Sequence, residues 1–170
     1  MASGAATARH LTRRFAGALL PGGPGPVDEA WVTGVLSPAE LALWRRMSGP
    51  DRRHAVAVGR RTADTADTAD PDGARALLAA ALLHDVGKVE SGLGTLMRVP
   101  ATLVGLLGGR AWAGRRVAAY LDHPRHGARL LRAAGAAPLA VAWAQEHHLP
   151  PARWTVPPGL GRVLAAADDD

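Results

Sequence analysis

The 170-residue sequence contains no cysteine. This absence excludes a disulfide framework and thiolate ligands, so any bound metal ion must be held by imidazole and carboxylate groups. A chain without cysteine also suits a reducing compartment, and we expect a cytoplasmic protein.

Aromatic residues are scarce as well, at 4% of the chain, although 48% of the residues are hydrophobic. Ala, Leu and Val dominate the hydrophobic fraction, a composition that favours packed helices over sheets. No segment alternates apolar and polar residues with a period of two. The sequence therefore predicts an all-α fold, with about seven or eight helices in a single compact domain.

Long apolar runs are missing. The longest candidate is interrupted by Arg110, Arg115 and Arg116, and stays short of the roughly 20 residues that a membrane span requires. A shorter apolar run over residues 15–20 follows two arginines and stops at a Pro/Gly-rich break, so we interpret it as a leader helix and not as an export signal. We expect a soluble protein without a membrane partner.

Lysine is nearly absent, since Lys88 is the only lysine among 20 basic residues. The net charge of +5 is spread along the chain without an aromatic-interleaved basic cluster, so polynucleotide binding is not indicated. A surface charge is served equally well by arginine. Lys88 therefore suggests a position that needs a compact ammonium group, the alternative being a chance survivor of the bias toward arginine.

Two helix starts are well marked. Residues 37–40 (Ser-Pro-Ala-Glu) combine an N-cap serine, a proline at the first helical position and a glutamate at the third, and predict a helix to about residue 47. Residues 48–51 (Ser-Gly-Pro-Asp) repeat this logic and predict a helix that carries His54. We divide the chain into residues 1–47, a leader with helices that pack on the core, and a main domain over residues 48–170.

The most apolar segment begins after Asp70. It predicts a helix over residues 74–86 that is apolar on nearly all sides and should therefore lie at the centre of the fold. Gly87 is expected to act as its C-terminal cap. The preceding Thr-Ala-Asp repeats, over residues 62–70, predict a helix end and a loop without chemistry.

Histidines concentrate at the remaining helices and their ends. Gly and Pro residues separate further helices expected near 95–107, 110–122, 124–134, 138–148 and 158–168. Six of the seven histidines lie at predicted helices or helix ends: His54, His84, His123, His126, His147 and His148. A single histidine on a helix is usually structural, so only the combination can indicate chemistry.

The adjacent pair His84-Asp85 is the centre of that combination. Neighbouring residues on a helix project about 100° apart, so both can reach one ion only near a helix end. A carboxylate in such an apolar helix is costly to bury without a cation beside it. The alternative is that Asp85 caps a neighbouring helix.

His54, then His84-Asp85 and finally a distant Asp168 resemble the His, His-Asp, Asp pattern of the HD superfamily of metal-dependent phosphohydrolases. The resemblance spans residues 48–170. Residues 84–88 (His-Asp-Val-Gly-Lys), 123–127 (His-Pro-Arg-His-Gly) and the pair at 147–148 are similar to the HD-GYP branch and other two-metal members. The Gly-Tyr-Pro signature and the glutamate after the paired histidines are missing, which argues against cyclic di-GMP as the substrate.

The resemblance implies an HD-type helical domain with one or two divalent ions. The first ion would be held by His54, His84, Asp85 and Asp168, with Asp169 in place of Asp168 if the register shifts by one. Asp85 would bridge to a second ion held by His123 and His147, with His148 as a further ligand. The donors suit Fe, Mn, Zn or Ni without distinguishing among them.

The implied reaction is hydrolysis of a small phosphoester or nucleotide by a metal-activated water. Two ions about 3.5–4 Å apart would lower the pKa of that water. Asp85 and Lys88 would be the catalytic residues, because the lysine of related enzymes contacts the substrate phosphate. Nothing in the sequence indicates an oligomeric state.

Two other functions fit the same pattern. Di-iron HD oxygenases similar to inositol oxygenase use the same order of ligands, and a non-catalytic regulatory module would keep the helical shell.

Aromatic residues are expected to pack in the core or at its rim, namely Trp112, Trp143, Trp154 and Tyr120. Arg125, Arg129 and Arg153 are expected on solvated helix faces, and His126 is expected to face solvent or to lie behind the ligands.

Overall fold

The computed structural model describes residues 22–65, 70–93 and 114–169, and all regular structure within these ranges is helical. The described elements, in chain order, are α2 (Pro26–Val35), α3 (Pro38–Arg45), α4 (Gly49–Ala63), α5 (Pro71–Leu83), the 3-10 helix η1 (Val86–Glu90), α7 (Arg115–Leu121), α8 (His123–Ala133), α9 (Pro138–Glu146), the 3-10 helix η3 (Pro151–Arg153) and α10 (Pro158–Asp169). The predicted all-α fold is confirmed.

Both marked helix starts are present. The Glu40 carboxylate accepts the Ser37 backbone N–H at 2.9 Å, and the Ser37 hydroxyl accepts the Glu40 N–H at 3.3 Å, which closes a capping box at the start of α3. The Ser48 hydroxyl accepts the Asp51 N–H in the same way at α4. Each cap stabilises its helix by about 0.5–2 kcal/mol. Helix α2 was not predicted.

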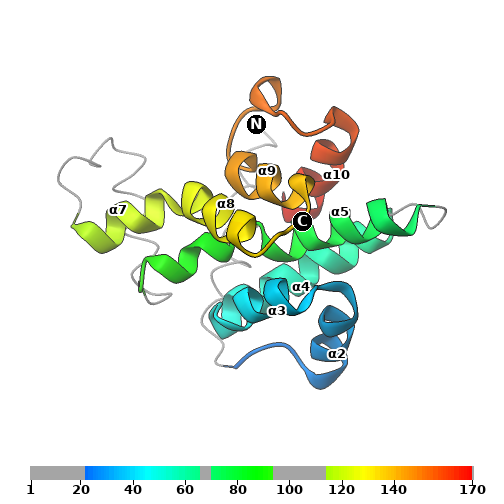
Figure 1. The fold of residues 1–170 in the computed structure, drawn as a ribbon, viewed down its shortest axis with the longest axis horizontal. Helices are drawn as coiled ribbons and strands as arrows, with labels where there is room; N and C mark the ends of the chain where they lie inside the picture. Colours follow the sequence, from blue (N-terminus) through cyan, green and yellow to red (C-terminus); the bar gives the residue numbers. More distant parts are fainter. Residues whose placement is uncertain (1–21, 66–69, 94–113, 170) are drawn as a thin grey trace, which may run out of the picture.

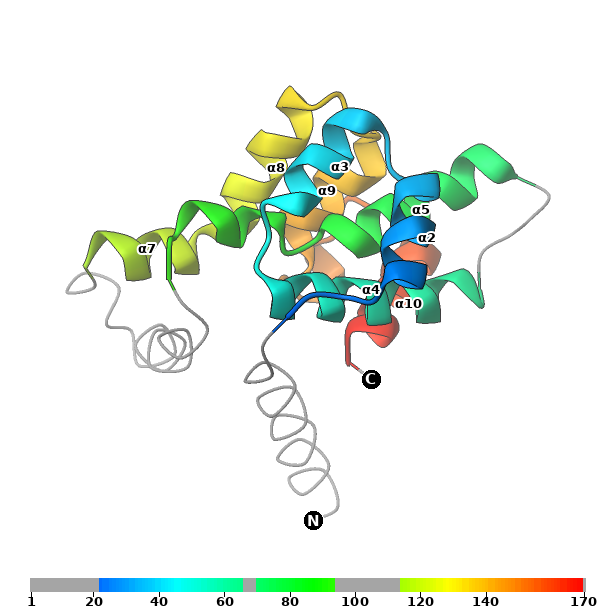
Figure 2. The same ribbon diagram turned by 90° about the horizontal axis from the view of Figure 1, so that it is seen from below.

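Helix α5 lies at the centre of the fold, as its composition predicts. It runs through the middle of the molecule in two perpendicular views, and in the first view α2 and α3 lie on one side of it and α9 and α10 on the other (Figures 1 and 2). Residues 79–83 are all buried, with exposed fractions of 3% or less. This helix packs most closely against α4 and α9.

Gly87 is not the C-terminal cap of this helix, contrary to the prediction. Helix α5 ends at Leu83 with His84 as its C-cap, and the chain continues into η1, where Gly87 does not adopt a positive φ. A Cβ atom at Gly87 would lie 1.9 Å from the His123 carbonyl oxygen and 2.5 Å from the Gly127 nitrogen. Glycine is needed here because the backbone of η1 packs directly against the backbone of α8.

Other predicted boundaries differ by a few residues. Helix α9 ends at Glu146 and not at 148, α7 begins at Arg115 and not at 110, and α8 begins at His123. The predicted leader helix, the helix over 95–107 and Trp112 lie outside the described residues. Among the described helices, none combines the length and apolar character needed to cross a membrane.

Candidate metal centre

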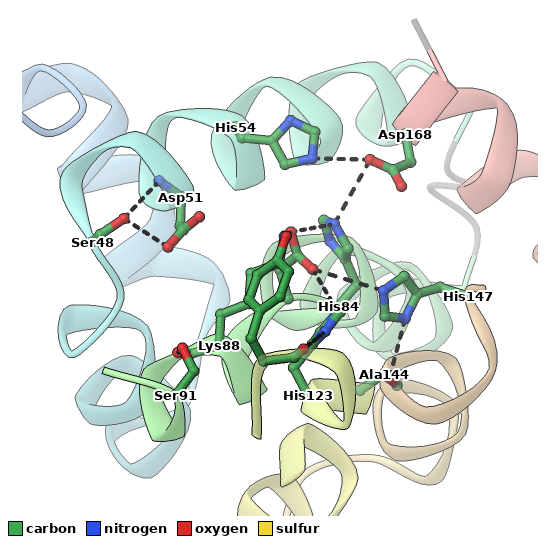
Figure 3. A network of polar contacts seen from close by, with 12 residues as sticks. Ser48, Asp51, His54, His84, Lys88, Ser91, His123, Ala144, His147 and Asp168 are labelled. Atoms are coloured by element: carbon green, nitrogen blue, oxygen red, sulfur yellow. Dashed lines mark hydrogen bonds and ion pairs between the residues drawn. The ribbon is translucent and has the colours of Figure 1, made fainter. Parts of the chain in front are cut away.

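The seven predicted metal-ligand residues lie close together in the structure, although they come from widely separated parts of the chain. Figure 3 shows several of their side chains turned toward one region. Their positions are His54 in α4, His84 at the end of α5, Asp85 at the start of η1, His123 at the start of α8, His147 and His148 just after α9, and Asp168 in the last turn of α10.

Asp85 occupies the middle of this cluster and is only 3% exposed. Its Oδ2 atom lies 3.5 Å from His84 Nε2, and its Oδ1 atom lies 3.3 Å from His123 Nε2 and 3.7 Å from His147 Nε2. The two oxygens of one carboxylate therefore face different imidazoles. Asp85 has left the helical conformation, with φ −96° and ψ 5°, so the adjacent His84 and Asp85 can point to a common region.

One group of donors forms around His84. His54 Nε2 and Asp168 Oδ1 are 2.9 Å apart, and His84 Nε2 lies 3.7 Å from the same oxygen. The donor atoms of His54, His84 and Asp85 all lie within 4.8 Å of one another, so they could hold one metal ion. Asp168, and not Asp169, is the residue that faces this group.

A second group lies on the other side of Asp85. The donor nitrogens of His123, His147 and His148 are within 4.8 Å of one another and could also hold an ion. The rings of His147 and His148 are 4.0 Å apart between centroids, and the His123 and His148 rings are 5.2 Å apart. His147 and His123 are almost fully covered, whereas His148 is exposed at the edge of the group.

The orientation of three imidazoles is fixed by backbone carbonyl oxygens. His84 Nδ1 lies 2.8 Å from the Ala81 oxygen, His123 Nδ1 lies 2.7 Å from the Tyr120 oxygen, and His147 Nδ1 lies 3.1 Å from the Ala144 oxygen. A carbonyl can only accept, so each Nδ1 carries a proton, and in the neutral form of each ring Nε2 then presents a lone pair. Metal-ligating histidines are held in this way.

These same Nε2 atoms have no hydrogen-bond partner. Among the described residues, the Nε2 atoms of His84, His123 and His147 are buried without one. An unpaired buried nitrogen is costly, and three of them around one buried carboxylate call for a ligand that accepts lone pairs. A divalent transition metal is such a ligand, so the residues present fit the implied ions.

Lys88 lies against the central carboxylate. Its ammonium forms an ion pair with Asp85 Oδ2, and its side chain is 16% exposed. Burial lowers the pKa of the Lys88 ammonium, but the charges of Asp85, Asp51 and Tyr120 more than offset this effect, and the pKa lies above its ordinary value. Lys88 is therefore charged at neutral pH.

Asp85 stays ionised for a matching reason. Burial raises the pKa of its carboxyl group, but the charge of Lys88, together with the adjacent imidazoles of His84, His123 and His147, outweighs burial. The pKa is held well below its usual value. The centre thus presents an anionic carboxylate between two sets of imidazole nitrogens.

Asp51 is a neighbour of the centre that the sequence analysis treated only as part of a helix cap. It is 8% exposed, accepts a hydrogen bond from the Ser48 hydroxyl at 2.6 Å and lies close enough to raise the pKa of Lys88 (Figure 3). The available signal was its spacing, because residues three apart on a helix lie on the same side and Asp51 precedes His54 by three.

The other residues singled out in the sequence lie outside the two donor groups. Trp143 is buried in the core against Trp154, with ring centroids 5.4 Å apart, and Tyr120 stacks on the His123 ring. His126 lines a separate surface hollow of about 380 Å³. The three arginines expected on solvated helix faces are exposed: Arg125, Arg129 and Arg153.

The fold and this arrangement define a helical domain with a buried His/Asp centre. The model of the HD domain family matches residues 52–169, a range that includes every predicted ligand. The chain belongs to the HD domain family, most of whose members are metal-dependent phosphohydrolases. No curated protein and no solved structure gave a match.

Proposed function

We propose that this protein is a metal-dependent phosphohydrolase that acts on a nucleotide or another small phosphoester. The observation that supports this most directly is Asp85, whose Oδ2 atom faces His84 and whose Oδ1 atom faces His123 and His147, three imidazoles whose buried Nε2 atoms have no hydrogen-bond partner. One carboxylate shared between two donor groups is the arrangement expected of a ligand that bridges two ions.

The proposed first site consists of His54, His84, Asp85 and Asp168, and the second of Asp85, His123, His147 and His148. Divalent ions bound there would lower the pKa of a water molecule and stabilise charge on phosphoryl oxygens. The set of nitrogen and oxygen donors suits Fe, Mn, Zn or Ni.

The chain's own residues perform the remaining tasks. Asp85 provides the negative charge that balances the ions in a buried setting. Lys88 keeps its proton and lies beside that carboxylate, where its ammonium can offset charge that develops on a substrate phosphate. Partial exposure of the His54, Asp168 and Lys88 side chains gives a substrate access to this side of the centre.

Metal content and hydrolysis together test the proposal. Protein purified without chelator should contain a transition metal, and a screen of phosphomonoesters and phosphodiesters with added Mn²⁺, Fe²⁺, Zn²⁺ or Ni²⁺ should reveal turnover. Asp85→Ala should lose both metal and turnover, because it removes the carboxylate that faces both donor groups.

Two results would contradict the proposal in different ways. A folded Asp85→Ala protein with unchanged metal content would refute the assigned centre. Retained metal in the unmodified protein without hydrolysis of any phosphoester would instead favour a non-catalytic module. Circular dichroism of the variant serves as the control for folding.

A further inference from the structure

Asp168 lies in the last turn of α10, where a helix is least constrained by its own hydrogen bonds. Carbonyl oxygens in a last turn have no partner within the helix and need one from elsewhere. Asp168 nevertheless has to present its carboxylate at a defined distance, 2.9 Å from His54 Nε2. Something outside α10 must therefore hold this turn in place.

Arg61 supplies that contact. Its Nε atom donates a hydrogen bond of 2.7 Å to the carbonyl oxygen of Ala167, the residue directly before Asp168. Arg61 follows His54 by seven residues, which is two turns of α4, so both side chains leave the same side of α4 and face α10. A guanidinium at a helix C-terminus also interacts favourably with the helix dipole.

We infer that Arg61 is a positioning residue for the first metal ion, which it serves by fixing the α10 turn that carries Asp168. The inference rests on the proposed function only in that Asp168 is taken as a ligand of that ion. Arg61 itself contacts a backbone carbonyl and takes no part in coordination. Groups that orient metal ligands typically contribute about 10- to 100-fold to metal affinity.

The chain offers a matched control in the neighbouring arginine. Arg60 lies on the other side of α4, where its Nη2 atom binds Asp28 Oδ1 of α2 at 2.9 Å and its guanidinium stacks on Trp31 at 4.0 Å. Removing Arg60 therefore removes comparable interactions of α4 without touching α10. Arg61→Met and Arg60→Met separate positioning of Asp168 from general stabilisation of α4.

The experiment titrates chelator-treated protein with Mn²⁺ alone and measures the affinity of each ion by calorimetry. His147→Ala identifies which binding step belongs to the second site. Arg61→Met should lower the affinity for the first ion by about 10- to 100-fold and leave the affinity for the second ion unchanged. Arg60→Met should lower the melting temperature but leave both affinities as they are.

The Asp168→Asn variant tests whether Arg61 acts on the first ion through Asp168. If Arg61 acts through Asp168, Arg61→Met should cause little further loss in an Asp168→Asn protein. Wild-type affinity in Arg61→Met, or an equal loss for both ions, would overturn the inference while leaving the proposed centre intact. Wild-type affinity in Asp168→Asn would refute the assignment of that ligand and the inference with it.

Chemical rescue covers the case in which Arg61→Met folds poorly. The space beside Arg61 opens into a surface hollow of about 470 Å³ that Arg162 and Ala167 also line. Millimolar guanidinium can therefore enter an Arg61→Ala protein and should restore part of the first-ion affinity. Arg61→Lys, which keeps a donor and the charge, should lose less than Arg61→Ala, and equal losses with no rescue would count against the inference.

Discussion

At the scale of single residues, Asp85 explains why the centre divides into two donor groups. Its Oδ1 atom faces His123 and His147, and its Oδ2 atom faces His84 and Lys88. The imidazoles of His84, His123 and His147 are each oriented by a separate backbone carbonyl, so removing one of these side chains leaves the other two in place. The two proposed sites should therefore respond separately to mutation.

His123→Ala and His147→Ala should each cost one equivalent of metal while the first ion stays bound. Both residues face Oδ1 of Asp85 and neither belongs to the group formed by His54, His84 and Asp85. Inductively coupled plasma analysis of the purified variants gives the stoichiometry. A single ion at saturation in the unmodified protein would refute the two-ion arrangement and leave a mononuclear centre.

Lys88 should contribute to turnover and not to metal retention. Its ammonium competes with a bound cation for Asp85 Oδ2, so Lys88→Met should bind metal at least as tightly as the wild type. Lys88→Arg keeps the charge but replaces a compact ammonium with a larger, planar guanidinium at a mostly buried position. Both variants should fold and lose about 10- to 1000-fold in turnover, the effect of removing one electrostatic donor.

Steady-state kinetics on whichever phosphoester the protein hydrolyses check this prediction, with metal analysis of the same samples as the control. Wild-type turnover in Lys88→Arg would show that any cation suffices there. In that case the single lysine of the chain would have been retained by chance in a composition biased toward arginine.

At the scale of elements, the contact between η1 and α8 sets the distance between the two donor groups. Gly87 lies in η1 between Asp85 and Lys88, and its backbone packs on the carbonyl of His123. Gly127 faces it from α8, where an added Cβ would lie 3.3 Å from the Gly87 nitrogen. Both glycines of the two motifs are thus explained by one backbone-to-backbone approach.

Gly87→Ala should move η1 away from α8 and weaken the binding of the second ion. The added Cβ would meet backbone atoms 1.9 and 2.5 Å away, which cannot move aside as a flexible side chain would. We expect a loss of about 1–3 kcal/mol in the free energy of unfolding, together with reduced metal stoichiometry. Urea unfolding and metal analysis measure the two effects.

Two other glycines serve as graded controls for this prediction. Gly127→Ala should cost less than Gly87→Ala, because its nearest contact is longer. Gly34 is exposed within α2 with nothing within 4 Å of an added Cβ, so Gly34→Ala should be neutral or stabilise by about 0.5–1 kcal/mol. Equal stability of the Gly87→Ala and Gly34→Ala proteins would contradict the packing argument.

The elements also show how far the sequence could predict this structure. The capped starts of α3 and α4 and the central position of α5 depend on local signals, and these predictions are confirmed. Gly87 was wrongly assigned because a glycine after a helix usually signals a cap, whereas its real constraint is a backbone distant in sequence. Long-range backbone contacts leave no local pattern.

The same reason limits prediction of the candidate centre. The histidine and aspartate motifs predicted which residues lie together, and the structure places Asp168 and not Asp169 beside His54. The residues around them could not be predicted in this way. Arg61 binds a carbonyl oxygen, which every residue possesses, and the spacing that places Asp51 on the His54 side of α4 does not reveal its approach to Lys88 of η1.

At the scale of the whole molecule, the centre ties the stability of the fold to metal and pH. The donors come from α4, α8 and α10, from the ends of α5 and α9 and from the start of η1, so bound ions would connect elements that are otherwise held by apolar packing. A ligand that binds only the folded state adds its binding energy to stability. Chelation should therefore leave a folded but less stable protein, because the hydrophobic core remains.

The metal-free protein should lose stability as the pH falls from 7 to 5. Burial lowers the pKa of His148 to about 3, although part of this residue remains exposed, and burial also lowers the pKa of His123. Histidines of the unfolded chain protonate near pH 6.5. Below that pH the unfolded state binds more protons than the folded state, so the free energy of unfolding decreases.

Among the residues that the structure describes, no other group with a shifted pKa changes this sign within the window. The lowered pKa of Asp85 acts only below its ordinary value of 3.8, and the raised pKa of Lys88 acts only near 10.5 and above. Thermal unfolding of chelator-treated protein at several pH values should show a falling melting temperature, and His148→Ala should reduce the slope because it removes one histidine that the fold keeps neutral. A melting temperature that stays constant from pH 7 to 5 would show that the folded protein accepts protons at the centre as readily as the unfolded chain, and that the imidazoles are not held as neutral donors.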